Sequence, residues 1–195
     1  MAYVAAQLAF LLAASLPLLA LALQPRADKK LVTLAETLGS EFAPERASPV
    51  WTTSDSDDGY IETGANRSLV FRNIVTGTGE TFVDAAKLGF TYYGYSIQPS
   101  RENVLFSANY TKVYRHSYNA SYFVYNRRTG AVTPLVDDQA GDIQLAQWST
   151  KGNTIAFVRG NDLYIWLNGT VTRITNDGGP DMFNAILDWV YEEGE

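Results

Sequence analysis

Two short stretches of the sequence carry side chains suited to binding charged or polar groups. The first is DWVYEE, in which Glu192 and Glu193 are adjacent carboxylates. Adjacent carboxylates repel each other unless a cation lies between them, so a buried pair is suited to binding an ammonium group. An exposed helix end is the alternative. The second stretch is YRHSY, where the planar guanidinium of Arg115 could donate to a carbonyl or carboxylate. A salt bridge within the fold is the alternative for Arg115.

The sequence shows no machinery for covalent catalysis. His116 is the single histidine, and no Gly-x-Ser-x-Gly sequence is present, so a serine nucleophile and its base cannot be assigned. There is no cysteine, which excludes thiol chemistry and Cys/His zinc sites. The acidic residues 55–59 lack the ligand spacing of an EF-hand, and we interpret both this stretch and NDGGP at 176–180 as turns. We therefore expect no catalytic residue, metal site or cofactor.

The N-terminal residues indicate the cellular route. Residues 5–23 carry no charge and are rich in Leu and Ala, and residues 20–22 read Ala-Leu-Ala, a pattern that signal peptidases cut. We predict a signal peptide at 1–23 and a secreted protein. The alternative is a retained anchor in the vacuolar membrane, because the apolar run is long enough to span a bilayer. No Lys or Arg precedes the run to hold the N-terminus in the cytoplasm.

Composition and sequons agree with an extracellular location. Four Asn-x-Ser/Thr sequons predict glycosylated surface loops at Asn66, Asn109, Asn119 and Asn168. The net charge is −6 and the basic residues are scattered. A nucleic-acid partner is therefore not expected.

Beyond the leader, a segment at 24–49 contains two prolines near its end and a short helical pattern at 31–38. From residue 50 onward the chain consists of short runs rich in Tyr, Phe, Val and Ile, separated by Gly, Asn, Asp and Ser turns. Similar units begin at Trp51, Ile97 and Trp148, which is near the spacing of four-stranded propeller blades. We predict an all-β fold, a partial β-propeller of about three four-stranded blades. A β-sandwich is the alternative.

At this point the residues resemble a known family. YTKVYRHSYNASYFVY, GDIQLAQWSTKGNTIAFVRGNDLYIW and RITNDGGPDMFNAILDWVYEE resemble the N-terminal propeller of the dipeptidyl-peptidase IV family, closest to the fungal secreted form. The resemblance runs from about Leu31 to Glu193. It identifies 50–195 as an incomplete N-terminal propeller domain of this family.

The resemblance implies a function for the two stretches with which we began. Members of the family are serine exopeptidases that remove N-terminal X-Pro or X-Ala dipeptides, and an eight-bladed propeller covers their α/β-hydrolase domain. Two glutamates hold the substrate amine and an arginine binds the carbonyl of the first residue. When the motifs are matched, the arginine corresponds to Arg115. The two glutamates correspond to Glu193, which follows Glu192, and to position 194. Members often dimerise, and peptide N-termini are the partners implied.

The sequence departs from the family pattern at its end. Position 194 is Gly rather than Glu, and the remaining blades, the hydrolase domain and the catalytic Ser, Asp and His are not among these residues. We therefore interpret the chain as a truncated member that supplies substrate recognition and has no peptidase activity of its own. The alternative is a noncatalytic secreted β-module that binds a protein or a glycan.

Overall fold

The computed structural model describes residues 31–39, 42–43, 48–52 and 59–187. The chain divides into two compact units, Met1–Arg46 and Ala47–Glu195, and each is considered by itself. The predicted signal peptide, the acidic residues 53–58 and the glutamates of DWVYEE lie outside the described residues.

The first unit contains the short helix expected near residues 31–38. Helix α2 spans Leu34–Leu38. Thr33 caps it, because its Oγ1 accepts a hydrogen bond from Glu36 N (3.3 Å) and its own N–H donates to Glu36 Oε2 (2.9 Å). This capping box satisfies two backbone donors that a helix start leaves without partners.

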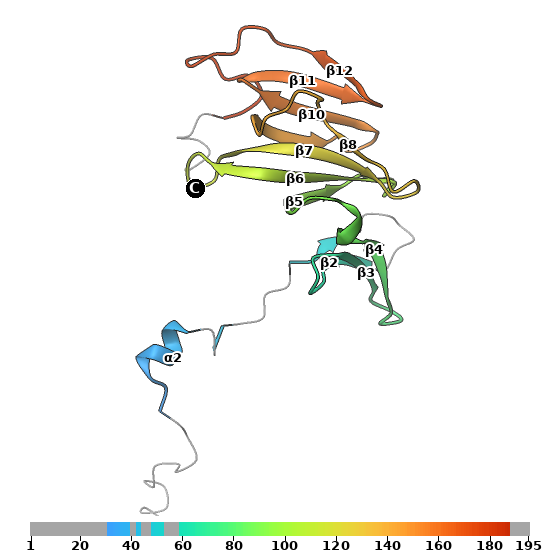
Figure 1. Ribbon diagram of the computed structural model, residues 1–195, viewed down its shortest axis with the longest axis vertical. Coiled ribbons are helices and arrows are strands. Elements are labelled where there is room, and N and C mark those ends of the chain that lie inside the picture. Colours follow the sequence, from blue (N-terminus) through green and yellow to red (C-terminus); the bar gives the residue numbers. More distant parts are fainter. Residues whose placement is uncertain (1–30, 40–41, 44–47, 53–58, 188–195) are drawn as a thin grey trace, which may run out of the picture. The chain divides into compact units, whose positions relative to one another are not determined.

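The described part of the second unit contains a four-stranded and an eight-stranded antiparallel sheet (Figure 1). The eight-stranded sheet is made of two groups of four consecutive strands, so there are three such groups, called here the first, second and third sheets. The first contains β1 (Val50–Trp51), β2 (Gly59–Thr63), β3 (Leu69–Asn73) and β4 (Gly79–Val83), followed by the 3-10 turn η1 (Ala85–Lys87). The second contains β5 (Tyr92–Ile97), β6 (Asn103–Lys112), β7 (Tyr118–Asn126) and β8 (Val132–Pro134). The third contains β9 (Ile143–Trp148), β10 (Thr154–Arg159), β11 (Asp162–Leu167) and β12 (Thr170–Arg173).

This arrangement confirms the predicted propeller-like fold. Each sheet is a meander of four strands, as a propeller blade is, whereas a sandwich would pair strands from distant parts of the chain. Only one residue pair, Ala120↔Ile143, joins the second and third sheets into a continuous ladder. The repeat residues Trp51, Ile97 and Trp148 are the last residues of β1, β5 and β9. The sequence repeat therefore marks the end of each blade's first strand.

The hydrophobic core forms two clusters, one between each pair of neighbouring sheets. Val104 and Phe106 of β6 face the first sheet, while Leu105 between them faces the third. Side chains alternate between the two faces of a strand. The middle sheet is therefore buried on both faces, which explains why VLFSA in β6 is continuously buried rather than alternating.

Polar contacts also connect the sheets. Arg127 donates to Phe82 O (3.1 Å) and lies 3.6 Å from the centre of the Phe82 ring, joining the second sheet to the first. Gln98, almost fully buried, donates to Asn153 Oδ1 (2.5 Å) and joins the second sheet to the third. Such directional contacts fix how neighbouring sheets are oriented, and with them the loops at the sheet ends.

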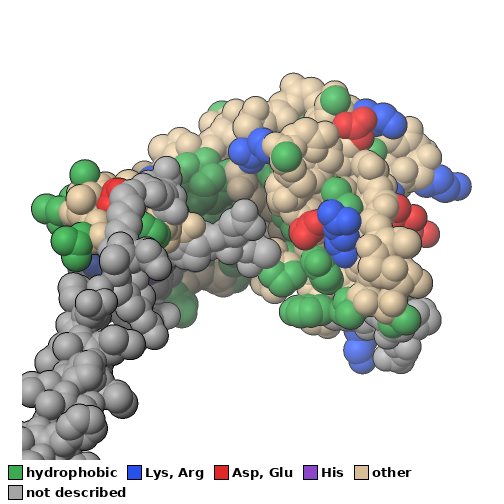
Figure 2. Space-filling view, turned by 90° about the horizontal axis from the view of Figure 1, so that it is seen from below, with side chains coloured by type: hydrophobic (Ala, Val, Ile, Leu, Met, Phe, Trp, Pro, Cys, Tyr) green, Lys and Arg blue, Asp and Glu red, His purple; other side chains and the backbone are tan. Residues whose placement is uncertain are grey.

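Charged side chains form no single-sign patch on the face shown in Figure 2. Lys and Arg side chains there lie among Asp and Glu side chains and uncharged surface. This mixed pattern agrees with the sequence, in which basic residues are scattered.

Candidate functional site

Arg115 lies at the tip of the β6–β7 hairpin. The two strands pair as far as Thr111↔Asn119 and Lys112↔Tyr118. The tip, residues 113–117, is then closed by a hydrogen bond from Val113 N to Ser117 O (3.0 Å). Strands β6 and β7 continue almost to the tip, so Arg115 is carried at the end of an extended two-stranded ribbon.

A cluster of tyrosines packs on the hairpin close to its tip. Tyr93 and Tyr110 stack with ring centres 4.0 Å apart, and Tyr118 lies 5.1 Å from Tyr110. Burial raises the pKa of Tyr110, and a hydrogen bond with Tyr93 raises it further. The Tyr110 phenol is therefore neutral at physiological pH and stacks on the Tyr93 ring without a charge penalty. A left-handed residue, Asn109 with φ 53°, forms the bulge that bends β6 toward the tip.

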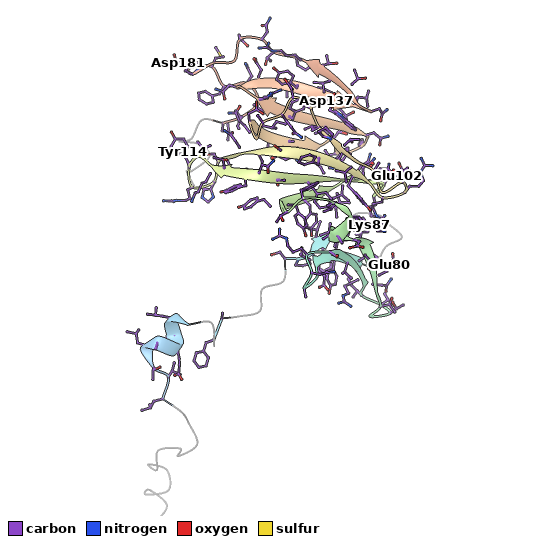
Figure 3. All side chains as sticks on the ribbon, in the orientation of Figure 1. Glu80, Lys87, Glu102, Tyr114, Asp137 and Asp181 are labelled. Carbon is purple, nitrogen blue, oxygen red and sulfur yellow. The ribbon has the colours of Figure 1, made fainter. Side chains whose placement is uncertain are left out.

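A second element reaches the hairpin from the third sheet. The segment that follows β12, residues 174–187, is called here the connecting segment. Asn184 N donates to Asn161 O (3.0 Å), and Gly179 and Met182 pair with each other. The Asn184 bond attaches the connecting segment to the turn between β10 and β11, and the Gly179–Met182 pair closes a turn within the segment. Figure 3 shows Tyr114 and Asp181 at the same end of neighbouring sheets, with Glu102 at the opposite end.

The hairpin tip and the connecting segment line a cavity of about 140 Å³ that is partly open to solvent. Its walls are mostly apolar and come from the hairpin, the connecting segment and β9: Val113, Tyr114, Ser117, Tyr118, Asn119, Gln144, Phe183, Ile186 and Leu187. Residues separated by about 70 positions in the sequence therefore meet at one place. The last of them, Leu187, is five residues before Glu192.

Of the three candidate binding residues, the structure describes Arg115 and not the two glutamates. Arg115 is exposed, and it lies between Tyr114 and Ser117, which line the cavity. Glu192 and Glu193 lie outside the described residues. The structure thus brings the Arg115 hairpin to the segment that leads into the glutamates, and it does not describe the glutamates themselves.

The four sequon asparagines occupy different environments. Asn66 and Asn168 are exposed in the β2–β3 and β11–β12 turns, and Asn109 is exposed in the bulge of β6. Asn119 is half-buried in β7 and lines the cavity. A glycan needs a path into water, so the first three are the better acceptors.

Other site classes find little support in the described part of the chain. Among those residues, no group of three or more His, Cys, Asp or Glu could hold a metal ion. No helix found there is long and apolar enough to cross a membrane.

Sequence reasoning missed several residues of this region. It assigned residues 176–180 to a turn and did not single out Phe183, Ile186 or the pair Asn161 and Asp162. The available signal was the apolar run MFNAIL after the last strand, whose spacing fits neither a strand nor an exposed loop.

Comparison with known proteins identifies the family. Residues 98–194 match the family model described as the dipeptidyl peptidase IV N-terminal region. The chain is 52% identical over 165 residues to dipeptidyl peptidase 4 of Trichophyton tonsurans, covering 84% of this chain and 21% of that protein. It is 49% identical over 166 residues to dipeptidyl peptidase 4 of Arthroderma otae, covering 85% and 21% respectively. The chain thus spans about one fifth of the length of these relatives.

A solved structure agrees in fold. The Porphyromonas gingivalis dipeptidyl peptidase 4 structure superposes with a TM-score of 0.72 at 26% identity, covering 85% of this chain and 25% of that one. The hairpin β6–β7 and the connecting segment both fall within residues 98–194, which the family model matches. The chain belongs to the dipeptidyl peptidase IV family and carries part of its N-terminal region.

Proposed function

We propose that this chain recognises the free N-terminus of a peptide as the N-terminal propeller portion of a secreted serine exopeptidase that releases X-Pro or X-Ala dipeptides. In this proposal Arg115 binds the carbonyl of the first peptide residue, and Glu193 with Glu192 binds the amine. The observation that carries the proposal is the shared cavity, which joins the Arg115 hairpin to the segment leading to the glutamates. Family membership supports it independently.

The proposed chemistry works as a distance measurement. If the amine is bound at the glutamates and the first carbonyl at Arg115, the peptide is held at two points from its N-terminus. Only the bond after the second residue then lies at a fixed place where a catalytic group can reach it. A peptide without a free amine leaves the carboxylates without their cation, which disfavours binding.

Secretion and glycosylation belong to the same proposal. Exposed sequons at Asn66, Asn109 and Asn168 support passage through the secretory route.

The test is a peptide titration of the full chain. The amide signals of the hairpin tip are followed by NMR while Ala-Pro-amide is added, and the titration is repeated with its N-acetylated form. We expect the free amine to bind roughly ten- to a hundredfold more tightly, since a charge-assisted hydrogen bond contributes about 1.5 to 3 kcal/mol. Arg115→Ala and Glu193→Gln should each weaken binding by a similar factor.

A matched control tests whether the effect of Arg115→Ala is specific or follows only from the loss of one positive charge. Arg128 is exposed in the turn between β7 and β8, at the end of the hairpin strands remote from the tip. Arg128→Ala removes the same charge and should leave binding unchanged. Equal affinity for the free and acetylated peptides would refute the proposed function.

A further inference from the structure

A buried carboxylate organises the connecting segment. Asp162 begins β11, and only 3% of its side chain is exposed. Its Oδ1 accepts hydrogen bonds from Thr175 Oγ1 (2.7 Å) and Gly178 N (3.0 Å), and its Oδ2 accepts from the Arg173 guanidinium. Asn184 Nδ2 donates to Oδ1 more weakly, at 3.4 Å. One carboxylate thus contacts the start, the middle and the far part of the segment.

The ionised form of this carboxylate is stabilised in the fold. Burial acts to raise the pKa of Asp162, but the hydrogen bonds from Thr175, Arg173 and Gly178 outweigh burial, so its pKa is lowered. Asp162 is therefore charged at physiological pH, and a charged acceptor makes stronger hydrogen bonds than a neutral one.

The turn before Asp162 adds a second set of contacts. Gly160 and Asn161 both have left-handed backbones, with φ of 59° and 63°, as a two-residue hairpin turn requires. The Asn161 side chain donates to Gly179 O (2.8 Å) and accepts from Gln144 Nε2 (2.7 Å). The connecting segment is thereby joined through Asn161 to β9 as well as to β11.

The attached segment then continues directly to the cavity. Asn184, bonded to Asn161 and Asp162, is followed by Ile186 and Leu187, which face the hairpin tip across the cavity. The path and direction of the chain entering DWVYEE are thus set by contacts centred on Asp162.

We infer that Asp162 is a positioning residue for amine recognition: by ordering the connecting segment it holds Ile186 and Leu187, which precede the two glutamates in the sequence, at the cavity beside the Arg115 hairpin. This inference rests on the proposed function. It assigns to Asp162 no contact with the peptide. Binding sites need their groups held in place before the ligand arrives, since a misplacement of about 1 Å can cost roughly a hundredfold.

The same sheet offers a matched control. Asp142 accepts a hydrogen bond from Arg159 Nε (2.7 Å), and Arg159 also binds Asp138 (2.7 Å). The pKa of Asp142 is lowered as well, because hydrogen bonds from Ala140 and Arg159 outweigh burial. This carboxylate attaches the loop between β8 and β9 through Ala140 and Arg159, neither of which belongs to the connecting segment.

The experiment compares Asp162→Asn with Asp142→Asn in the full chain. Each variant is titrated with Ala-Pro-amide and N-acetyl-Ala-Pro-amide, and its melting temperature is recorded. We expect Asp162→Asn to reduce the preference for the free amine roughly ten- to a hundredfold, and Asp142→Asn to keep it. Thr175→Val, which removes a single hydroxyl donor to Asp162, serves as a milder variant if Asp162→Asn unfolds.

The outcomes separate the inference from the proposed function. Loss of amine preference in Asp162→Asn or Thr175→Val, with the preference kept in Asp142→Asn at equal or lower melting temperature, supports the positioning role. If the unaltered chain prefers the free amine and both Asp162→Asn and Thr175→Val keep that preference, Asp162 is only structural and the inference is overturned. If the unaltered chain shows no preference, the proposed function fails, and the positioning role fails with it.

Discussion

Replacement of Gly178 by alanine should detach the connecting segment from the third sheet. A Cβ atom at Gly178 would lie 2.6 Å from both C and O of Asn161 and 2.8 Å from Cγ of Asp162. Two of these atoms are backbone atoms of a tight left-handed turn, which cannot rotate aside as a side-chain end can. Ordinary contact begins near 3.4 Å, so the segment must move by about 0.8 Å.

The cost follows from the hydrogen bonds that such a movement strains. Gly178 N donates to the charged Asp162 Oδ1 (3.0 Å), and Asn161 Nδ2 donates to Gly179 O (2.8 Å). A bond to a charged group contributes about 1.5 to 3 kcal/mol and a neutral bond about 0.5 to 1.5 kcal/mol. Losing both lowers the local stability of the segment by about 2 to 4.5 kcal/mol. Local opening should then become roughly 30- to 2,000-fold more frequent.

Amide hydrogen exchange measures this directly. The reporter is Asn184 N, which donates to Asn161 O, and backbone amides of β6 serve as an internal reference. The matched control is Gly179→Ala, because a Cβ at Gly179 meets nothing within 4 Å. Exchange at Asn184 in Gly178→Ala that stays within about threefold of the Gly179→Ala control would refute the reasoning, since that factor is only about 0.7 kcal/mol.

Three further predictions concern the core, the pH dependence and the surface. Phe106 is fully buried against several rings, so Phe106→Ala should lower the free energy of unfolding by about 3 to 5 kcal/mol in urea titrations. Leu145 is exposed, so Leu145→Ala should change the free energy of unfolding by less than about 0.5 kcal/mol. Because the pKa values of Asp142 and Asp162 are lowered, the stability they contribute is fully present above their unfolded pKa of about 3.9 and is lost as pH falls through the folded values. Replacing both with Asn should therefore flatten the fall in unfolding free energy between about pH 5 and 2, and an unchanged slope would contradict this. Asn168→Gln should remove one glycan from the chain secreted by a eukaryotic host, seen as a mass decrease, and an unchanged mass would count against glycosylation of that turn.

The blade pattern could be predicted from the sequence because it depends on local chemistry. Turns rich in Gly, Asn and Asp recur between short β-forming runs, and a meander pairs each run with the next one along the chain. The hairpin turn Gly160-Asn161 illustrates this, since both residues tolerate the left-handed backbone that they adopt. The predicted start of each blade was one strand too late. Trp51, Ile97 and Trp148 are easily noticed in the sequence, but each stands at the end of its blade's first strand.

The site could be predicted only in part, because its geometry depends on contacts between distant residues. The family motif located Arg115, but spacing alone could not show that Val113 and Leu187 share a cavity. Asp162 was hidden for the same reason. Next to Asn161 it resembles an ordinary turn residue, and its partners Thr175, Gly178 and Asn184 lie 13 to 22 positions away.

The same contacts explain why recognition should depend on the junction between the second and third sheets. The hairpin with Arg115 belongs to one sheet and the connecting segment to the next, so their separation is set by how the two sheets meet. They meet at the pair Ala120↔Ile143 and through Gln98, whose side chain donates to Asn153 Oδ1 (2.5 Å) between β9 and β10. The proposed binding of a peptide at two points therefore requires a rigid junction between blades as much as it requires the binding groups themselves.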